Sequence, residues 1–393
     1  MNRGHSGANL PALRSHNAAL VLDLLRTAGA AGISRLELAE STGLTPQAVS
    51  KITARLREAG LAAEAGQRAS TGGKPRTVLR LVRGARSAVG LHLDRDELTA
   101  VLTDLTGEPL AVRTVPFDFG ADAAAVVDGA AAEVRALLQG AGVGPVLGVG
   151  VAGPGPLDHR TGVLGRVTGF PQWDGYPLRA ALAERLGLPV VLDKDTNAAA
   201  LGLALAAPPH PDGASAAPSF AYLHLGTGLG AGLVLGGGLH RGSRTGAGEF
   251  GHQVIQLDGP PCGCGDHGCV EALCLAAVAR GDTPAAARVL GIGAANLVGL
   301  LDIDRVLLGG RTVVAAPEAF LTGVGAVLTE RAAREGAAGR AGRPVPVAVA
   351  PGGGHTVVHG AAQLILAPLF GHAAARPGPA ETLTTPSDQE IVG

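Results

Sequence analysis

The sequence predicts an α/β protein with an N-terminal all-α winged helix-turn-helix head and a large α/β body. Near the N-terminus, apolar side chains recur at helical spacing between helix start and stop signals. From residue 87 onward, short strand-like segments alternate with alanine-rich helical segments, which is typical of sheets covered by helices. Residues 1–86 carry 13 Lys and Arg against 5 Asp and Glu, whereas residues 87–393 carry 19 against 28. A basic head on an acidic body indicates a nucleic-acid-binding module.

The head is expected to contain three helices and a β-hairpin wing. Ser34 and Glu37 form a capping-box pair that begins the second helix. Thr45 is predicted to be the N-cap of the third helix, and Pro46 is predicted to be its first residue. The expected elements of the head are helices 16–28, 34–42 and 45–59, and strands 61–64 and 77–82 joined by the basic turn 67–76.

The body is expected to hold mixed sheets between helices, because strand and helix patterns alternate along it. Strands are predicted at 89–93, 98–103, 146–151, 190–192, 221–225, 232–235, 305–308 and 345–350, and helices at 121–139, 178–186, 196–206, 271–280, 284–300 and 316–336.

Composition disfavours secreted and membrane proteins. The first apolar stretch, 18–22, is cut by Asp23, so no signal peptide is expected. Long apolar stretches such as 143–157 are broken by Gly and Pro and are too short to span a bilayer. Four cysteines in 393 residues do not make a disulfide scaffold, so a reducing cytoplasm is expected.

The third helix is the candidate DNA-reading element, because a helix-turn-helix places its second helix in the major groove. Gln and Lys can pair with adenine and guanine, and hydroxyl and guanidinium groups suit phosphates. Arg68 also lies on the wing. The alternative is a basic three-helix unit used for protein contacts. The predicted DNA-binding residues are Gln47, Ser50 and Lys51 for bases, and Thr45, Arg55, Lys74 and Arg76 for phosphates or the minor groove.

His252, Cys262, Cys264 and Cys269 are candidate metal ligands. Three thiolates and one imidazole complete a closed tetrahedral Zn²⁺ shell, the structural type of zinc site. The alternative is a set of unrelated free thiols, with His267 as a possible substitute ligand. Cys274 falls in an apolar helical segment and is expected to pack in the core.

Three linked motifs resemble the signature of the ROK family of sugar kinases and sugar-responsive repressors. They are Gly226-Thr-Gly-Leu-Gly-Ala-Gly232, Gly248-Glu-Phe-Gly-His252 and Cys262-Gly-Cys-Gly-Asp-His-Gly-Cys-Val-Glu271. With the preceding winged helix-turn-helix, which the repressor branch carries, the resemblance covers about residues 16–370.

The resemblance implies a two-lobed actin-like (ribonuclease H-like) fold with a sugar in the cleft. The expected domains are residues 1–86, a first lobe 87–206 with a C-terminal helix 357–372, a second lobe 207–356, and a disordered tail 373–393. Asp195 resembles the kinase catalytic base. Asp195 could instead serve only as a helix cap. Glu249 and Glu271 could be ordinary surface carboxylates. Residues 226–232 could form a tight hairpin that binds no phosphate. The implied ligand contacts are Gly153, Lys194, Asp195, Glu249, His252 and Glu271.

Two departures from the family pattern shape the expected function. The first phosphate loop of the kinases is rich in glycine, but no glycine lies between Leu91 and Thr106, and carboxylates at 94, 96 and 97 would repel a triphosphate. We therefore expect no kinase activity. Lys194 and Gly169 stand where asparagines are common. Lys194 would favour an anionic ligand, or it could pair with Asp193 or Glu271 and close the site.

These features predict a cytoplasmic, sequence-specific transcription regulator, expected to repress carbohydrate-utilisation genes. Its partners would be a palindromic DNA operator and a sugar or sugar-phosphate effector, with two-fold symmetry supplied by a homodimer or homotetramer and no role for a membrane. The basic head alone is expected to bind DNA. The alternatives are a sugar kinase with a DNA-binding head, and a ligand-independent regulator whose sugar site has decayed.

Overall fold

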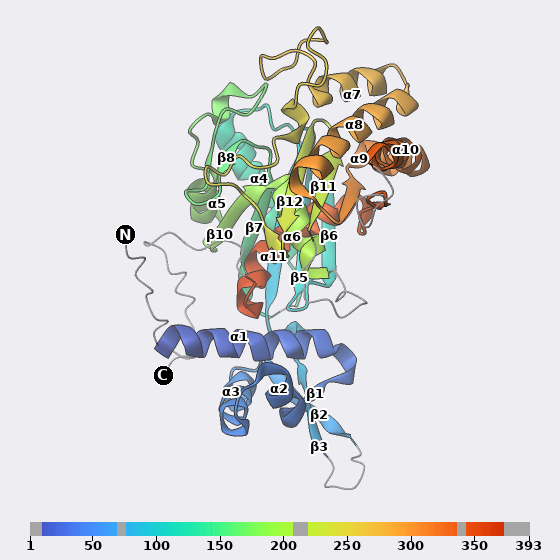
Figure 1. Cartoon of the computed structure of the whole chain (residues 1–393). Helices are drawn as coiled ribbons and strands as arrows, with labels where there is room; N and C mark the ends of the chain where they lie inside the picture. Colours follow the sequence, from blue (N-terminus) through green and yellow to red (C-terminus); the bar gives the residue numbers. More distant parts are fainter. Residues whose placement is uncertain (1–9, 69–75, 143, 207–218, 336–342, 373–393) are drawn as a thin grey trace, which may run out of the picture.

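The structure is a computed structural model that describes residues 10–68, 76–142, 144–206, 219–335 and 343–372. A small winged helix-turn-helix head lies against one end of an α/β body built from two lobes (Figure 1). The predicted wing residue Lys74 and the predicted tail 373–393 lie outside the described residues.

The head folds as its capping signals predict. Glu37 Oε2 accepts a hydrogen bond from the Ser34 amide at 2.7 Å, and Ser34 Oγ accepts one from the Glu37 amide, completing the capping box. Thr45 Oγ1 accepts from the Ala48 amide at 3.2 Å at the start of the third helix. The elements are α1 (Leu10–Ala28), β1 (Ile33–Ser34), α2 (Arg35–Thr42), α3 (Pro46–Glu58), β2 (Ala62–Arg68) and β3 (Arg76–Leu81).

The first lobe is built on a five-stranded sheet in the order β10-β7-β4-β5-β6. Strand β6 was not predicted, because it is an edge strand with mostly exposed side chains and so shows no alternation of buried and exposed residues. The elements are β4 (Ser87–Leu93), β5 (Glu97–Asp104), β6 (Pro109–Pro116), α4 (Ala123–Leu138), β7 (Val146–Gly153), β8 (Leu157–Asp158), β9 (Val163–Leu164), α5 (Leu178–Leu186) and β10 (Val190–Lys194).

The second lobe has a five-stranded sheet in the order β13-β12-β11-β14-β15. In the described part of the chain, only α8 is long and apolar enough to cross a membrane, and it packs against α7 and α10 as a core helix does. The elements are β11 (Phe220–Leu225), β12 (Leu229–Leu235), β13 (Gly238–Leu239), α7 (Val270–Ala279), α8 (Thr283–Leu301), β14 (Arg305–Gly309), α9 (Arg311–Ala315), α10 (Pro317–Glu335) and β15 (Val347–Val349).

Two helices, α6 (Asp195–Ala206) and α11 (Thr356–Leu366), connect the lobes. Their axes approach closely at a glycine, since a Cβ on Gly360 would lie 2.0 Å from the Ala198 carbonyl oxygen. Both helices contribute buried side chains to a core cluster that also contains Tyr222 and Leu307 of the second lobe. The crossing therefore holds the first turn of α6 between the two sheets.

The head shares a hydrophobic core with the first lobe. Val21 and Leu25 of α1 pack with Leu366 and Phe370, the latter in a short 3-10 turn after α11. Helix α1 lies across the end of the body, and α2 and α3 lie on its far side (Figure 1). The candidate DNA-reading helix is thus held away from the acidic body.

Candidate functional site

Helix α3 presents the predicted base-reading residues to solvent. Gln47, Ser50 and Lys51 are exposed, whereas Val49 and Leu56 are buried in the head core. The exposed residues lie together on one face of the helix, so that this face can enter a major groove. Arg55 is half-buried beside this face, and Thr45, exposed at its start, uses its hydroxyl oxygen as the helix N-cap.

The described part of the wing divides its arginines between two roles. Arg76 is exposed at the start of β3, where it can contact DNA. Arg68 instead pairs with Glu37 at 2.8 Å and donates to the carbonyl oxygen of Ala31 at 3.0 Å. Arg68 therefore ties the wing to α2, a structural role that the sequence pattern did not reveal.

A polar cleft between the lobes brings together five of the six predicted ligand-contacting residues. Asp195, Glu249 and Glu271 line it. Gly153 does not, because β7 continues through Gly153 and the chain turns into the cleft only afterwards. The residues lining the cleft are Leu93, Asp94, Arg95, Pro154, Gly155, Thr168, Lys194, Asp195, Thr196, His224, Thr227, Gly228, Leu229, Gly230, Gly248, Glu249, His252 and Glu271.

Two cleft carboxylates are oriented by backbone amides. Asp195 begins α6, and its Oδ1 accepts from the Thr196 amide at 2.6 Å. Glu271, in the first turn of α7, accepts from the Leu229 amide at 2.7 Å. Each carboxylate keeps one oxygen outside these contacts, so both can accept hydrogen bonds from ligand hydroxyl groups.

Lys194 pairs with Glu249, so neither Asp193 nor Glu271, the partners that the sequence left open for it, forms its ion pair. Its Nζ lies 2.9 Å from Glu249 Oε1 and also donates to the carbonyl oxygen of Ala247. Asp193 is unavailable because Arg241 Nε donates to its Oδ2 at 2.7 Å and Asn197 to its Oδ1 at 2.8 Å.

An ion pair that includes the cleft residue Asp94 joins the lobes. Arg311, the first residue of α9, donates to both carboxylate oxygens of Asp96 at 2.9 and 2.6 Å, and lies 3.4 Å from Asp94. Thr227 Oγ1 also donates to Asp94 at 2.9 Å. The Arg311 hydrogen bonds hold the pKa of Asp96 below its ordinary value. Arg311 was not predicted as a site residue.

His224 is a second cleft residue that the sequence patterns missed. It stands on β11, and its Nδ1 lies 3.0 Å from the hydroxyl group of Tyr222. Burial raises the pKa of Tyr222, so this phenol stays neutral and can hold the imidazole ring. An isolated histidine in a strand carries no motif, and only the assembled cleft identifies it.

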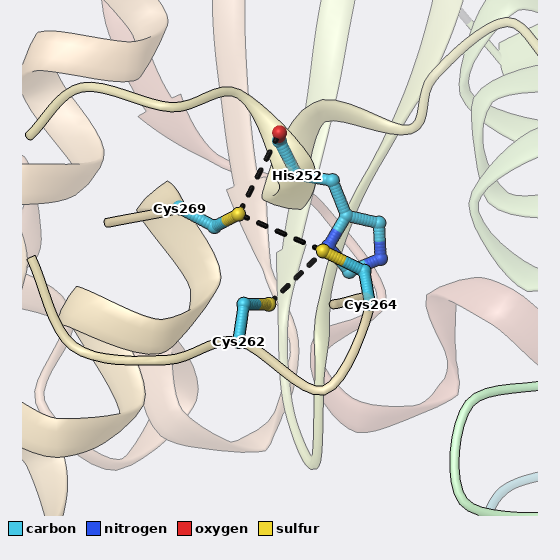
Figure 2. Close-up of side chains that lie close together, drawn as sticks. All are labelled: His252, Cys262, Cys264 and Cys269. Atoms are coloured by element: carbon cyan, nitrogen blue, oxygen red, sulfur yellow. Dashed lines mark hydrogen bonds between the residues drawn. The ribbon is translucent and has the colours of Figure 1, made fainter. Parts of the chain in front are cut away.

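The predicted metal ligands meet at one point beside the cleft (Figure 2). The donor atoms of His252, Cys262, Cys264 and Cys269 all lie within 4.8 Å of one another. Cys264 Sγ lies 3.7 Å from Cys269 Sγ, and Cys262 Sγ lies 3.6 Å from His252 Nδ1. A tetrahedral zinc ion with Zn–S bonds of about 2.3 Å separates its sulfur ligands by about 3.8 Å. The four side chains can therefore hold a metal.

The thiols of this cluster need a cation to become ligands. Burial and the neighbouring sulfurs raise the pKa of Cys269 to about 12, and burial raises the pKa of Cys262. A metal replaces these protons and holds thiolates together. Cys274 is fully buried away from the cluster, which confirms its predicted core position, and His267 is exposed outside the cluster.

Comparison with known proteins agrees with this architecture. The model of the ROK family matches residues 88–280, and a winged helix-turn-helix DNA-binding model matches residues 21–62. The ROK hexokinase structure from Thermus thermophilus is 31% identical, with 70% of this chain and 96% of that chain covered and a TM-score of 0.53. A ROK family transcriptional regulator, a homologue of the Escherichia coli MLC protein, covers 92% of this chain and 98% of its own at 24% identity and a TM-score of 0.72.

Among curated sequences, the xylose repressor of Caldicellulosiruptor bescii is 28% identical over 241 residues. The match covers 61% of this chain and 59% of that repressor, so the chain spans about three fifths of its length.

Proposed function

Because the chain belongs to the ROK family, we propose that it is a DNA-binding transcription regulator controlled by a sugar or sugar derivative in the interlobe cleft. One observation carries the proposal: the head shares a core with the first lobe, so the exposed face of α3 is rigidly joined to one wall of the cleft. Relatives named as repressors support this reading. We expect the protein to repress genes of carbohydrate utilisation.

The coupling we propose runs through the helix crossing. A sugar held by Asp195, Glu271 and His252 would draw the lobes together. Because Asp195 is the first residue of α6, the bound sugar would also pull on this helix. Helix α6 crosses α11, and the chain after α11 packs against α1 of the head. The sugar would thereby change operator affinity by about 1–3 kcal/mol of coupling free energy. In this proposal, two copies of the chain bind a palindromic operator in the cytoplasm.

We propose zinc as the metal of the cysteine cluster. Three thiolates and one imidazole form a closed shell of the structural kind. The ion would hold His252 through Nδ1 while the same ring lines the cleft, and it would fix Cys269 directly before the helix that carries Glu271. Zinc would thus orient two groups of the sugar site.

We also propose that the protein does not transfer phosphate. The turn between β4 and β5, where the kinases of the family hold phosphate, carries Asp94 and Asp96 paired with Arg311. Phosphoryl transfer requires amides and cations around the phosphates, and here the cation is already bound to carboxylates. Purified protein given ATP and a panel of sugars should release no ADP above the background. Turnover at ordinary kinase rates would contradict this proposal.

The regulatory function is tested by mapping the genomic sites that the full-length protein occupies, followed by titration of operator binding with sugars. Gln47→Ala together with Lys51→Ala should abolish selective occupancy, because it removes the two longest side chains of the exposed α3 face. Arg113→Ala, on the edge strand of the first lobe, is the control. If the double variant occupied the same sites as the unchanged protein, α3 would not be the reading helix.

A second candidate function is that of a ligand-independent regulator. The cleft encloses a cavity volume of only about 90 Å³, and the Lys194–Glu249 pair stands within its lining. Ligand pockets usually span roughly 300–1,000 Å³. This alternative predicts that no sugar changes operator affinity, so the titration above separates the two functions.

A further inference from the structure

We propose that Lys194 is a specificity-determining residue. Paired with Glu249, it makes a charge-neutral donor–acceptor pair that selects uncharged polyhydroxyl ligands and rejects phosphorylated or acidic sugars. This inference rests on the proposed function, because it names the class of sugar that the same cleft takes. It replaces the sequence-based expectation that the lysine charge would attract an anion.

The position of Lys194 is set by packing on both sides of the cleft. Its side chain is 4% exposed, and its Nζ contacts Glu249 Oε1 and the Ala247 carbonyl oxygen. A Cβ on Gly155 would come within 2.8 Å of Lys194 Cδ, so the stem of the lysine lies directly against that backbone. Lys194 therefore cannot swing toward a ligand without losing its contacts.

The charge of Lys194 is already neutralised. A buried ammonium group needs a paired carboxylate, because its separation from water is otherwise very costly. Asp193 cannot serve, since Arg241 and Asn197 occupy its two oxygens. A ligand anion that accepted the remaining hydrogen of the ammonium group would lie beside the Glu249 carboxylate and be repelled by it, and one that displaced Glu249 would leave that carboxylate without its cation.

The rest of the cleft also disfavours an anion. Asp195 and Glu271 line it with backbone amides as their hydrogen-bond donors, and no ion pair to either occurs among the described residues. Arg311 is shared between Asp94 and Asp96, so its single positive charge does not exceed theirs. Apart from Lys194, the cationic side chain in the lining is Arg95, which stacks on the Phe170 ring at 5.5 Å. Its one positive charge stands against the two negative charges of Asp195 and Glu271. An added negative charge would thus face a net negative surface.

Two neighbouring hydroxyl groups of a sugar can use the hydrogen-bond donor and acceptor that remain free on Lys194 and Glu249. An ammonium group has three hydrogens, and the two contacts use two of them. The Glu249 side chain is 41% exposed and retains its second oxygen for a hydroxyl donor. One hydroxyl can accept from Lys194 while its neighbour donates to Glu249, with no change in total charge.

The test is calorimetry on the full-length protein with matched pairs of probes. The pairs are D-glucose with glucose 6-phosphate and with D-glucuronate, and N-acetylglucosamine with its 6-phosphate; D-xylose is added as a neutral probe. We expect each charged member to bind at least about tenfold more weakly than its neutral partner. Equal or tighter binding of the charged members would overturn this inference while leaving sugar control intact. If no probe or other sugar binds, the proposed sugar-controlled function fails as well.

Two variants test the pair itself. Glu249→Gln keeps the shape of the side chain but leaves the charge of the ammonium group uncompensated. The affinity for the charged member of a pair should therefore rise about tenfold relative to the affinity for the neutral member. Lys194→Gln leaves Glu249 uncompensated, so discrimination against the charged member should persist or grow. Thermal melting checks that both variants fold. An unchanged ratio in Glu249→Gln, or lost discrimination in folded Lys194→Gln, would refute the role of the pair.

Discussion

Two pairs of acidic residues in and beside the interlobe cleft have opposite roles. Asp195 and Glu271 are oriented by backbone amides, and each keeps an oxygen for a ligand. Asp94 and Asp96 instead share an ion pair with Arg311, which reaches them from the second lobe. The first pair can accept hydrogen bonds from hydroxyl groups, whereas the second bridges the lobes. The contrast supports the proposal of ligand sensing without group transfer.

The largest expected effect comes from breaking the metal cluster beside the cleft. Cys264→Ser should remove a ligand and free the loop that carries His252 and leads to Glu271. We expect a loss of at least about 4 kcal/mol in unfolding free energy, in the range seen when a metal site is lost. Sugar binding should disappear with it. Cys274→Ser, outside the cluster, is the control for removal of a thiol.

An unchanged melting temperature and zinc content in Cys264→Ser would contradict a structural metal site. Zinc is measured by metal analysis of the purified protein, and stability by denaturant unfolding.

A smaller effect is expected when Asp195 loses its charge. Asp195→Asn keeps an oxygen that can accept from the Thr196 amide, so stability should change little. The affinity for sugar should fall by about 1.5–3 kcal/mol, the value of a hydrogen bond to a charged group. Calorimetry measures the affinity. If sugar binds as tightly as before, Asp195 serves only the start of α6, and the proposed sugar contacts of the cleft are wrong.

The smallest effect is expected at the interlobe ion pair of Arg311. Arg311→Gln removes an ion pair whose side chains are about half exposed, so the loss in stability should be about 0.2–1 kcal/mol. Because this pair joins the lobes, sugar affinity should change by a similar amount. Arg113→Gln, which breaks a pair with Glu133 inside the first lobe, should alter stability but not sugar affinity. Equal effects of both variants on sugar binding would exclude an interlobe role for Arg311.

Local signals predicted much of the head and of the metal cluster. The capping box of Ser34 and Glu37, and the N-cap of Thr45, depend on residues three positions apart, so the sequence displays them directly. The three cysteines are close in sequence and have a ligand spacing that a single loop can satisfy. Strand β6 escaped prediction because its exposed faces show no buried periodicity.

The polar pairs of the cleft escaped prediction for a different reason. Arg311 lies 215 residues from Asp96, Lys194 lies 55 from Glu249, and Arg241 lies 48 from Asp193. No local pattern links such partners. Lys194 shows the difficulty most clearly, since its residue type allowed either an anion site or an ion pair, and only the structure shows that Glu249 compensates its charge.

The sequence by itself determined where α2 and α3 begin, most of the strands and helices of the body, and a set of candidate metal ligands that meet in the structure, although it placed the start of the first helix at residue 16 and α1 begins at Leu10. Each depends on capping, hydrophobic periodicity or short ligand spacing, all of which are properties of neighbouring residues. Only the tertiary structure decided which carboxylates of the cleft are neutralised, that Arg68 supports the wing, and that the head shares its core with the first lobe. These depend on how distant segments pack, because electrostatic and hydrophobic contacts act over a few ångströms of space regardless of separation along the chain.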